Sequence, residues 1–281
     1  MKVELHSHSI YSHGKKVYVE GLDSPEQMVR YASENGLGGL AITDHDVFKG
    51  SLKAKKYAKK YDVIVIPGIE ITTEKRGHVL GLGIQEKIPS FLSVKETVDR
   101  IHDQGGIAVA PHPFDIGRFG VKSEVKYCDA FEIFNALSLE KASNRRSLKF
   151  YEKNKDFPVV SGTDAHCKEM LGFGAIEVKG ESMDEILNNV KKGKAKPNFD
   201  YVPERIITKW AVERLRRSYT YTLKYMEENY NYPKRILYKK LLDIAQRDSL
   251  ATRFLFRAMA EFGLGIAKAY GAFVELFRWR L

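Results

Sequence analysis

Histidine is unevenly distributed in this chain of 281 residues. Seven of its eight histidines lie at or beside an end of a short apolar segment, and only His102 falls elsewhere. The seven are His6, His8, His13, His45, His78, His112 and His166. Three acidic residues accompany them: Asp44, Glu70 and Asp164. Barrel and sheet enzymes bring side chains from many strand ends to one mouth, so this distribution predicts a single cluster of metal ligands.

Apolar segments of strand length alternate with helical segments over the first 195 residues. Segments rich in Val, Ile, Leu, Ala and Gly are typical of buried parallel strands. The segment at residues 78–84 follows the preceding strand after a short turn, which suggests a local hairpin. The alternation predicts an α/β fold, with either a barrel or a parallel sheet. The predicted strands are Val3–His8, Leu37–Thr43, Val63–Ile71, His78–Ile84, Ile107–His112, Ala130–Asn135 and Val159–Thr163.

Helix signals fill the intervals between these strands. Ser24 and Pro25 are typical of an N-cap and a first helical residue, and Gly36 ends that helix. Ser93 and Glu96 form a capping box that leads into the helix Thr97–Gln104. The other helices predicted in this region are Ser51–Tyr61, Glu140–Lys155 and Ser182–Lys192.

Strand patterns disappear beyond about residue 198, which divides the chain into a domain at 1–198 and a helical extension at 199–281. Helices are predicted at residues 204–229, 234–248 and 249–280. The last is amphipathic, and its apolar stripe predicts packing on the barrel or on a second copy, giving a homo-oligomer. The stripe consists of Phe254, Ala258, Phe262, Ile266, Ala269, Phe273 and Leu276.

Positive charge is concentrated in the extension. The chain has a net charge of +10; residues 1–200 contain 30 Lys and Arg against 28 Asp and Glu, whereas residues 201–281 contain 16 against 8. A basic extension suggests an anionic partner such as nucleic acid, and the alternative is a solvated helical face. Arginines interleaved with tyrosines would suit nucleic acid, but we favour an ordinary helical subdomain with its tyrosines on the barrel. These residues are Arg214, Arg216, Arg217, Tyr219, Tyr221 and Tyr225.

Composition also bears on location. The two cysteines, Cys128 and Cys167, show no spacing that suggests a disulfide. The N-terminal sequence has no apolar stretch of signal-peptide length, and no window reaches eighteen uninterrupted apolar residues, so no membrane span is expected. These features predict a cytoplasmic protein.

Two of the strand ends carry ligand pairs. His6 and His8 are two residues apart, so in a strand both imidazoles point to the same side and can bind one metal ion. Asp164 and His166 have the same spacing. A histidine pair of this kind taken alone is more common on a solvent-facing surface than in a metal site. At the second strand end, Asp44 could serve as a helix N-cap or orient a ligand from behind, with His45 on the metal.

A single carboxylate, Glu70, lies within an apolar strand. An unpaired buried carboxylate is costly, so Glu70 needs a cation or hydrogen bonds. Because a carboxylate has two oxygens, Glu70 is the candidate bridge between two metal ions. His78 begins the next strand, and His112 lies between two prolines; either one taken alone could be a structural histidine.

Taken together, these motifs resemble the PHP family (polymerase and histidinol phosphatase), whose members are metal-dependent phosphoesterases. The matching pieces are His6-Ser7-His8, Thr43-Asp44-His45, Pro67-Gly68-Ile69-Glu70, His78, Pro111-His112-Pro113 and Gly162-Thr163-Asp164-Ala165-His166. They occur in the family's order and cover about residues 1–200. The resemblance implies a distorted (β/α)7 barrel with up to three metal ions at the C-terminal ends of the strands.

The resemblance also implies how the ligands are shared. One ion would be bound by His6, His8, Glu70 and Asp164, and a second by Glu70, His78 and His112. A third would be bound by His13, His45 and His166, although many relatives have Asp-Gly where this chain has His13-Gly14. Mixed histidine and carboxylate ligation suits Zn, Mn or Fe and does not select among them.

Such a site implies hydrolysis of a phosphate ester by a metal-bridged hydroxide, with Glu70 and Asp164 as catalytic ligands. Arg118 could bind the phosphate, as could Lys15 and Lys16, and the alternative for all three is plain surface charge. Glu132 and Asn135 end the sixth strand and could support the ligands from behind. The expected substrate is a phosphorylated small molecule or a nucleotide. The alternatives are a nuclease that holds nucleic acid with its basic extension and a non-catalytic binding module.

Overall fold

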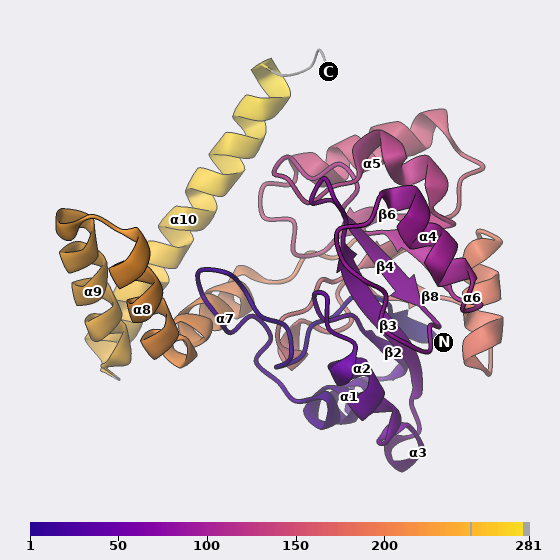
Figure 1. Cartoon of the computed structure of the whole chain (residues 1–281), viewed down its shortest axis with the longest axis horizontal. Coiled ribbons are helices and arrows are strands. Elements are labelled where there is room, and N and C mark those ends of the chain that lie inside the picture. Colours follow the sequence, from indigo (N-terminus) through magenta and orange to yellow (C-terminus); the bar gives the residue numbers. More distant parts are fainter. Residues whose placement is uncertain (248, 278–281) are drawn as a thin grey trace.

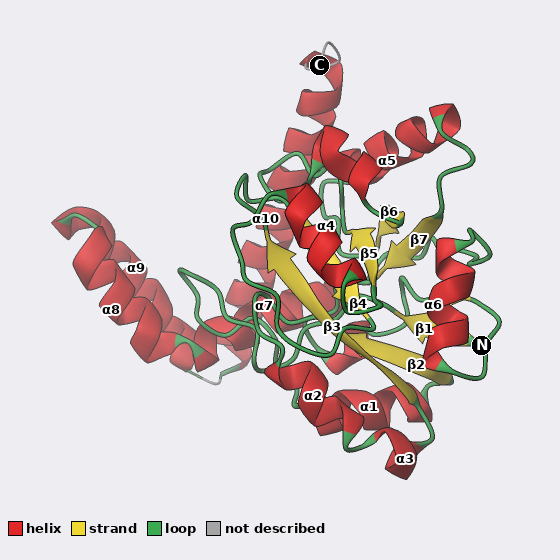
Figure 2. Cartoon of the chain, turned by 45° about the vertical axis from the view of Figure 1, so that its right-hand side comes forward, coloured by secondary structure: helices red, strands yellow, loops and turns green. Residues whose placement is uncertain are grey.

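The computed structural model describes residues 1–247 and 249–277. Its centre is an eight-stranded sheet in the order β7-β6-β5-β4-β3-β2-β1-β8 (Figure 1). The sheet curls into an almost closed barrel with helices outside it (Figure 2). The strands are β1 (Lys2–Glu4), β2 (Leu37–Ile42), β3 (Ile64–Thr72), β4 (His78–Leu82), β5 (Ile107–Ala110), β6 (Ala130–Asn135), β7 (Val159–Gly162) and β8 (Ile176–Glu177).

Most neighbouring strands are parallel. The exceptions are β4, which pairs antiparallel with both β3 and β5, and β8, which pairs antiparallel with β1. The hairpin expected at residues 78–84 is therefore confirmed. The segment that follows β1 contacts the segment that follows β7, which brings the two sides of the sheet together. There the His8 amide donates to the Ala165 carbonyl at 2.7 Å, and a parallel bridge joins Ser7 to Ala165. The predicted distorted barrel with a helical extension is confirmed.

Helices cover the outside of the barrel. The capping box at Ser24 begins α1, and Ser93 caps α4. The predicted helix Ser51–Tyr61 consists of two helices, and β8 was not predicted. Apolar residues on one strand face pack beneath α1, whereas those on the other face, among them Val3 and Ile66, pack on α6. The helices are α1 (Pro25–Glu34), α2 (Lys49–Lys55), α3 (Ala58–Tyr61), α4 (Val94–His102), α5 (Ala142–Lys153) and α6 (Met183–Lys191).

Four helices form the C-terminal part, and α8 and α9 extend away from the barrel in both views (Figures 1 and 2). The predicted helix at 204–229 divides at Ser218, and α7 packs into the main apolar core through Ile207 and Trp210. The division of the chain at residue 198 stays a prediction. The helices are α7 (Glu204–Arg217), α8 (Tyr219–Asn229), α9 (Tyr232–Gln246) and α10 (Leu250–Phe277). The predicted helix ends at 248 and 278–280 fall outside the described residues.

The face of α10 that contacts the rest of the protein differs from the predicted one. Phe256, Leu264 and Val274 are buried, whereas the predicted stripe is exposed, with Phe254 and Phe262 more than 70% accessible. The prediction that this stripe packs on the barrel is wrong. The physical reason is that α10 is apolar on two faces, so its periodicity alone does not select the packed one.

None of the helices in the described ranges is both long enough and apolar enough to cross a membrane. The cytoplasmic location stays a prediction.

Candidate metal centre

The barrel topology brings the predicted ligands to one end of the barrel. His6 and His8 follow β1, His45 follows β2, and His112 follows β5, so each lies beyond the C-terminal end of a parallel strand. Asp164 and His166 follow β7 in the same way, and Glu70 lies near the end of β3. His78 begins its strand, but β4 runs antiparallel, so its start lies at the same end of the barrel. Sequence positions 6 to 166 thereby converge on one site.

Glu70 is fully buried at the centre of this cluster. Its Oε1 lies 2.7 Å from His78 Nδ1 and 3.3 Å from His112 Nε2. Its Oε2 lies 3.0 Å from His45 Nδ1 and 3.4 Å from Nε2 of both His6 and His8. The two oxygens therefore face different sets of imidazoles, which is the geometry that a bridging carboxylate requires.

Asp164 supplies the second carboxylate. Its Oδ1 lies 3.1 Å from His8 Nε2 and 3.6 Å from His6 Nε2. The backbone at Asp164 is left-handed, with φ of 59°, and His112 has a φ of 31°. Non-glycine residues with positive φ are uncommon, and such backbone strain is found preferentially at functional sites. Both strained residues direct their side chains toward Glu70 and its partners.

Charges within the cluster are strongly coupled. Burial favours neutral side chains, yet the surrounding imidazoles hold the pKa of Glu70 and of Asp164 well below the usual carboxylate range. Burial likewise opposes charge on His6, but the carboxylates beside it raise its pKa well above 6.5, and Glu70 raises the pKa of His45 to about 9. In contrast, burial lowers the pKa of His8 to about 4. Burial also opposes charge on His112, but Glu70 raises its pKa, so without metal ions protonated imidazoles offset the charge of the carboxylates.

A third group of imidazoles lies on the side of the cluster that faces α7. His8, His45 and His166 have ring nitrogens within 4.8 Å of one another. Glu20, which the sequence did not single out, places its Oε2 3.7 Å from His45 Nε2. His13, the predicted member of this group, is exposed and stacks on Tyr18 with ring centroids 4.0 Å apart. His13 is absent from the ligand groups formed by the described residues, and its role as a ligand stays a prediction.

Several buried groups hold the ligands from behind. Glu132 accepts from His6 Nδ1 at 2.8 Å with Oε1, and its Oε2 accepts from the His112 amide and from Asn135 Nδ2. Only glycine fits at position 162, because a Cβ there would lie 1.8 Å from Glu132 Oε1. Fixing the second ring nitrogen of a ligand in this way sets its tautomer and orientation. The supporting position expected for Glu132 and Asn135 agrees with these contacts.

Two further carboxylates lie beneath the strand ends. Asp44 is buried and accepts hydrogen bonds from the Ser9 amide and hydroxyl at 2.6 and 2.7 Å, and burial raises the pKa of Asp44 to about 7. Glu4 is buried and accepts from Thr163 and from the amides of His6 and Gly172, while burial raises its pKa. Asp44 and Glu4 thereby hydrogen-bond to the segments that carry the candidate ligands. Neither carboxylate belongs to a group of potential metal ligands among the described residues.

The donor set fits divalent metal ions. Four groups of three donors have ligand atoms within 4.8 Å of one another. Nitrogen–oxygen distances around Glu70 run from 2.7 to 3.4 Å, and all but the shortest match the ligand–ligand separations of about 3.0–3.4 Å that metal–ligand bonds of about 2.0–2.1 Å produce. Nδ1 of His112 is buried and lacks a hydrogen-bond partner among residues 1–247 and 249–277, so a water molecule is expected behind this ring.

The other predicted phosphate-binding residues lie at the periphery. Arg118 is exposed on the loop after β5, where its neighbour Phe119 stacks on His78 at 5.0 Å. Lys15 and Lys16 are exposed, and their carbonyls accept hydrogen bonds from Tyr221 and Thr222 of α8. A role for Arg118 in phosphate binding stays a prediction.

The fold and this cluster define a barrel protein with a histidine- and carboxylate-rich metal centre. Comparison with protein families agrees: residues 4–157 match the PHP domain, and residues 141–195 match the PHP-associated region. The chain belongs to the PHP domain family.

Individual relatives support this assignment. An uncharacterized protein of Methanocaldococcus jannaschii is 31% identical over 245 residues, covering 79% of this chain and 94% of the relative. A phosphoribosyl 1,2-cyclic phosphate 1,2-diphosphodiesterase of Eggerthella lenta is 33% identical over 35% of this chain and 37% of its own length. A 5'-3' exoribonuclease of Haemophilus influenzae is 30% identical over 38% of each chain.

The fold has a counterpart among solved structures. A two-domain protein of Bacteroides vulgatus, described as containing a predicted PHP-like metal-dependent phosphoesterase, superposes with a TM-score of 0.57. The match covers 75% of this chain and 69% of that protein at 16% sequence identity.

Proposed function

We propose that this protein is a metal-dependent phosphoesterase that binds two or three divalent ions, Zn, Mn or Fe. The observation that carries the proposal is the position of Glu70, whose two oxygens face five imidazoles in two sets. A carboxylate and imidazoles in this arrangement suit adjacent metal ions. Family membership agrees, because the named relatives include a phosphodiesterase and an exoribonuclease.

We propose the ligand sets that the family resemblance implies, and the close spacing of the donor atoms supports them. His6, His8, Glu70 and Asp164 would hold one ion, Glu70, His78 and His112 a second, and His45 and His166 a third, together with either His13 or Glu20. Bound divalent ions lower the pKa of water and offset charge on phosphoryl oxygens. The protein's own part would be to fix these donors through Glu132, Glu4 and Asp44.

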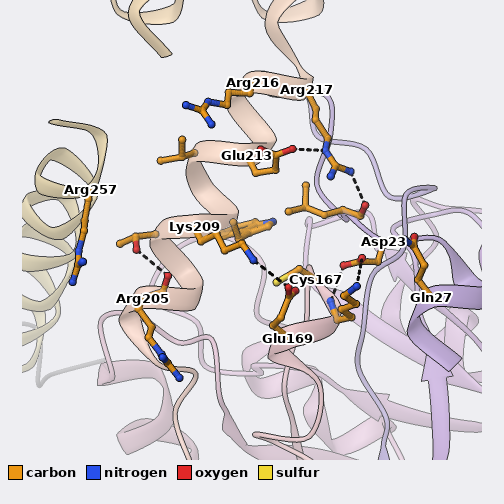
Figure 3. A pocket seen from close by; sticks show the side chains of 15 residues that line it. Asp23, Gln27, Cys167, Glu169, Arg205, Lys209, Glu213, Arg216, Arg217 and Arg257 are labelled. Carbon is orange, nitrogen blue, oxygen red and sulfur yellow. Dashed lines mark hydrogen bonds and ion pairs between the residues drawn. The ribbon is translucent and has the colours of Figure 1, made fainter. Parts of the chain in front are cut away.

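A nuclease is the second candidate, and a groove beside the metal centre favours it. The groove has a volume of about 680 Å³ and lies between the barrel, α7 and α10 (Figure 3). Trp210 lines it and also packs against the candidate ligand His166, with the two rings tilted by 50°. Basic residues outnumber acidic ones six to three along its walls, a balance that suits a phosphate backbone. The basic residues are Lys168, Arg205, Lys209, Arg216, Arg217 and Arg257.

One experiment tests both candidates. Purified protein is loaded separately with Mn, Zn and Fe, its metal content is measured, and it is assayed with phosphomonoesters, cyclic phosphodiesters and single-stranded oligonucleotides at 50 and 200 mM salt. We expect at least two bound ions per chain and hydrolysis of one substrate class. Oligonucleotide binding that weakens at least about tenfold at the higher salt supports a nuclease. Fewer than two ions per chain, or turnover of none of these substrates, contradicts the phosphoesterase proposal.

We also propose that two copies associate through the exposed stripe of α10. Its large apolar side chains extend over several helical turns, and exposed apolar patches of this kind mark interaction sites. Replacing both Phe254 and Phe262 with Glu should convert a dimer into a monomer, measured by light scattering after size exclusion. Phe91→Glu, which changes an exposed phenylalanine on the barrel, is the matched control. A wild-type monomer at micromolar concentration would refute the proposal.

A further inference from the structure

Helix α7 lies beyond residue 195, where the family matches end, yet it contacts the metal centre. The Trp210 ring is 4.9 Å from the ring of His166, and its Nε1 donates to the Glu20 carbonyl at 2.8 Å. Trp210 thus contacts both a candidate ligand and the segment that carries Glu20. α7 therefore forms a wall of the site rather than a separate appendage.

Arg214 lies one helical turn after Trp210, and its guanidinium stacks over the indole with 4.7 Å to the ring centroid. Its Nη2 is 3.8 Å from Glu20 Oε1, and the other oxygen of Glu20 is 3.7 Å from His45 Nε2. Arg214 is therefore separated from the imidazole cluster by a single carboxylate. A guanidinium stacked on an aromatic ring is already oriented, so it loses little conformational freedom on binding an anion.

The hydrogen-bonding capacity of Arg214 is mostly unused. Its side chain is only 22% accessible, and its Nε is buried without a hydrogen-bond partner among the described residues. The contact with Glu20, at 3.8 Å, is an ion pair longer than a hydrogen bond. A guanidinium has five N–H donors, and burying such donors unsatisfied is unfavourable. An anion at the metal centre would satisfy them.

We propose that Arg214 binds a phosphoryl oxygen of the substrate on the His8, His45 and His166 side of the metal centre, with Trp210 holding the guanidinium in place. This inference rests on the proposed phosphoesterase function. Arg214 lies beyond residue 195, where the matches to the family models end. Glu20 keeps Arg214 beside the cluster when no substrate is bound. The planar fork of arginine pairs with two phosphate oxygens at once, which lysine cannot do.

The test compares Arg214→Gln and Arg214→Lys with Arg30→Gln, which removes the same charge from an exposed position on α1. Metal content and thermal unfolding are measured first. Inorganic phosphate is then titrated calorimetrically into each metal-loaded protein, and KM and kcat are measured with p-nitrophenyl phosphate. We expect phosphate affinity to fall about 10- to 100-fold in Arg214→Gln, to recover only in part in Arg214→Lys, and to be unchanged in Arg30→Gln.

Each outcome decides the inference. Arg214→Gln with normal metal content and wild-type phosphate affinity would overturn it, as would a loss of metal content, which would make Arg214 a structural residue. A wild-type protein that binds no phosphate would overturn it as well. Phosphate binding that depends on Arg214 in a protein that hydrolyses no phosphate ester would leave this inference standing while the proposed activity fails.

Discussion

Glu70→Gln is expected to reduce phosphate-ester hydrolysis on the order of 10³-fold or more and to lower metal content below two ions per chain. Gln has the same shape as Glu, so the change leaves no cavity. It replaces one carboxylate oxygen with an amide nitrogen that cannot bind a metal ion. Because each oxygen of Glu70 faces different imidazoles, either orientation of the amide removes a ligand from one set. Metal analysis and initial rates measure the effect.

Glu96→Gln provides the matched control, since Glu96 is exposed on α4 and pairs only across the helix surface with Arg100. That variant should retain full metal content and activity. A Glu70→Gln protein that still binds two ions per chain would contradict the bridging role, even if its activity falls. Activity near the wild-type level would contradict the proposal outright.

The sequence predicted the strand-end ligands because their chemistry leaves a local trace. An imidazole pair two residues apart, or a carboxylate such as Glu70 inside an apolar strand, is costly unless it binds something. The direction of β4 explains why His78 belongs with the others although it begins its strand rather than ending it. Short segments of the sequence were sufficient to predict this part of the candidate site and every barrel strand except β8.

Residues that reach the site through tertiary packing left no such trace. Glu20 lies in an irregular loop, and Arg214 belongs to a helix almost 200 positions later; only the folded structure places them 3.8 Å apart. Glu4 alternates with apolar neighbours in β1, so it resembles an ordinary outward-facing residue in the sequence, yet it is fully buried. His13 was counted with the other clustered histidines and assigned to the third ion by resemblance, and its ring packs on Tyr18.

Metal binding is expected to become much stronger as pH rises from 6.5 to 9. A histidine must lose its proton to bind a metal ion, and both His6 and His45 are protonated in the metal-free cluster. Burial lowers the pKa of His8 to about 4, so it is already neutral. Two released protons correspond to an increase in apparent affinity of about 100-fold per pH unit in this range.

The same pKa shifts make the metal-free protein less stable as pH rises, whereas they make metal binding stronger. For His6 and His45 the folded-state pKa lies above the unfolded value of 6.5, so their ion pairs stabilise the metal-free protein fully below pH 6.5. This contribution disappears as pH rises toward 9, through the folded-state pKa of His45. Metal-free protein should therefore unfold at lower temperature as pH increases, whereas bound metal ions should increasingly offset that loss.

Calorimetric titration of Mn²⁺ into metal-free protein, in two buffers that differ in ionisation enthalpy, measures the number of protons released. We expect about two at pH 7.5. His45→Gln should reduce the number of released protons by one. His8→Gln should weaken metal binding without changing the number of released protons, because of these two residues His45 is protonated and His8 is neutral. Release of no protons at pH 7.5, or equal proton loss in the two variants, would show that carboxylate and imidazole charges in the cluster are not balanced as these distances indicate.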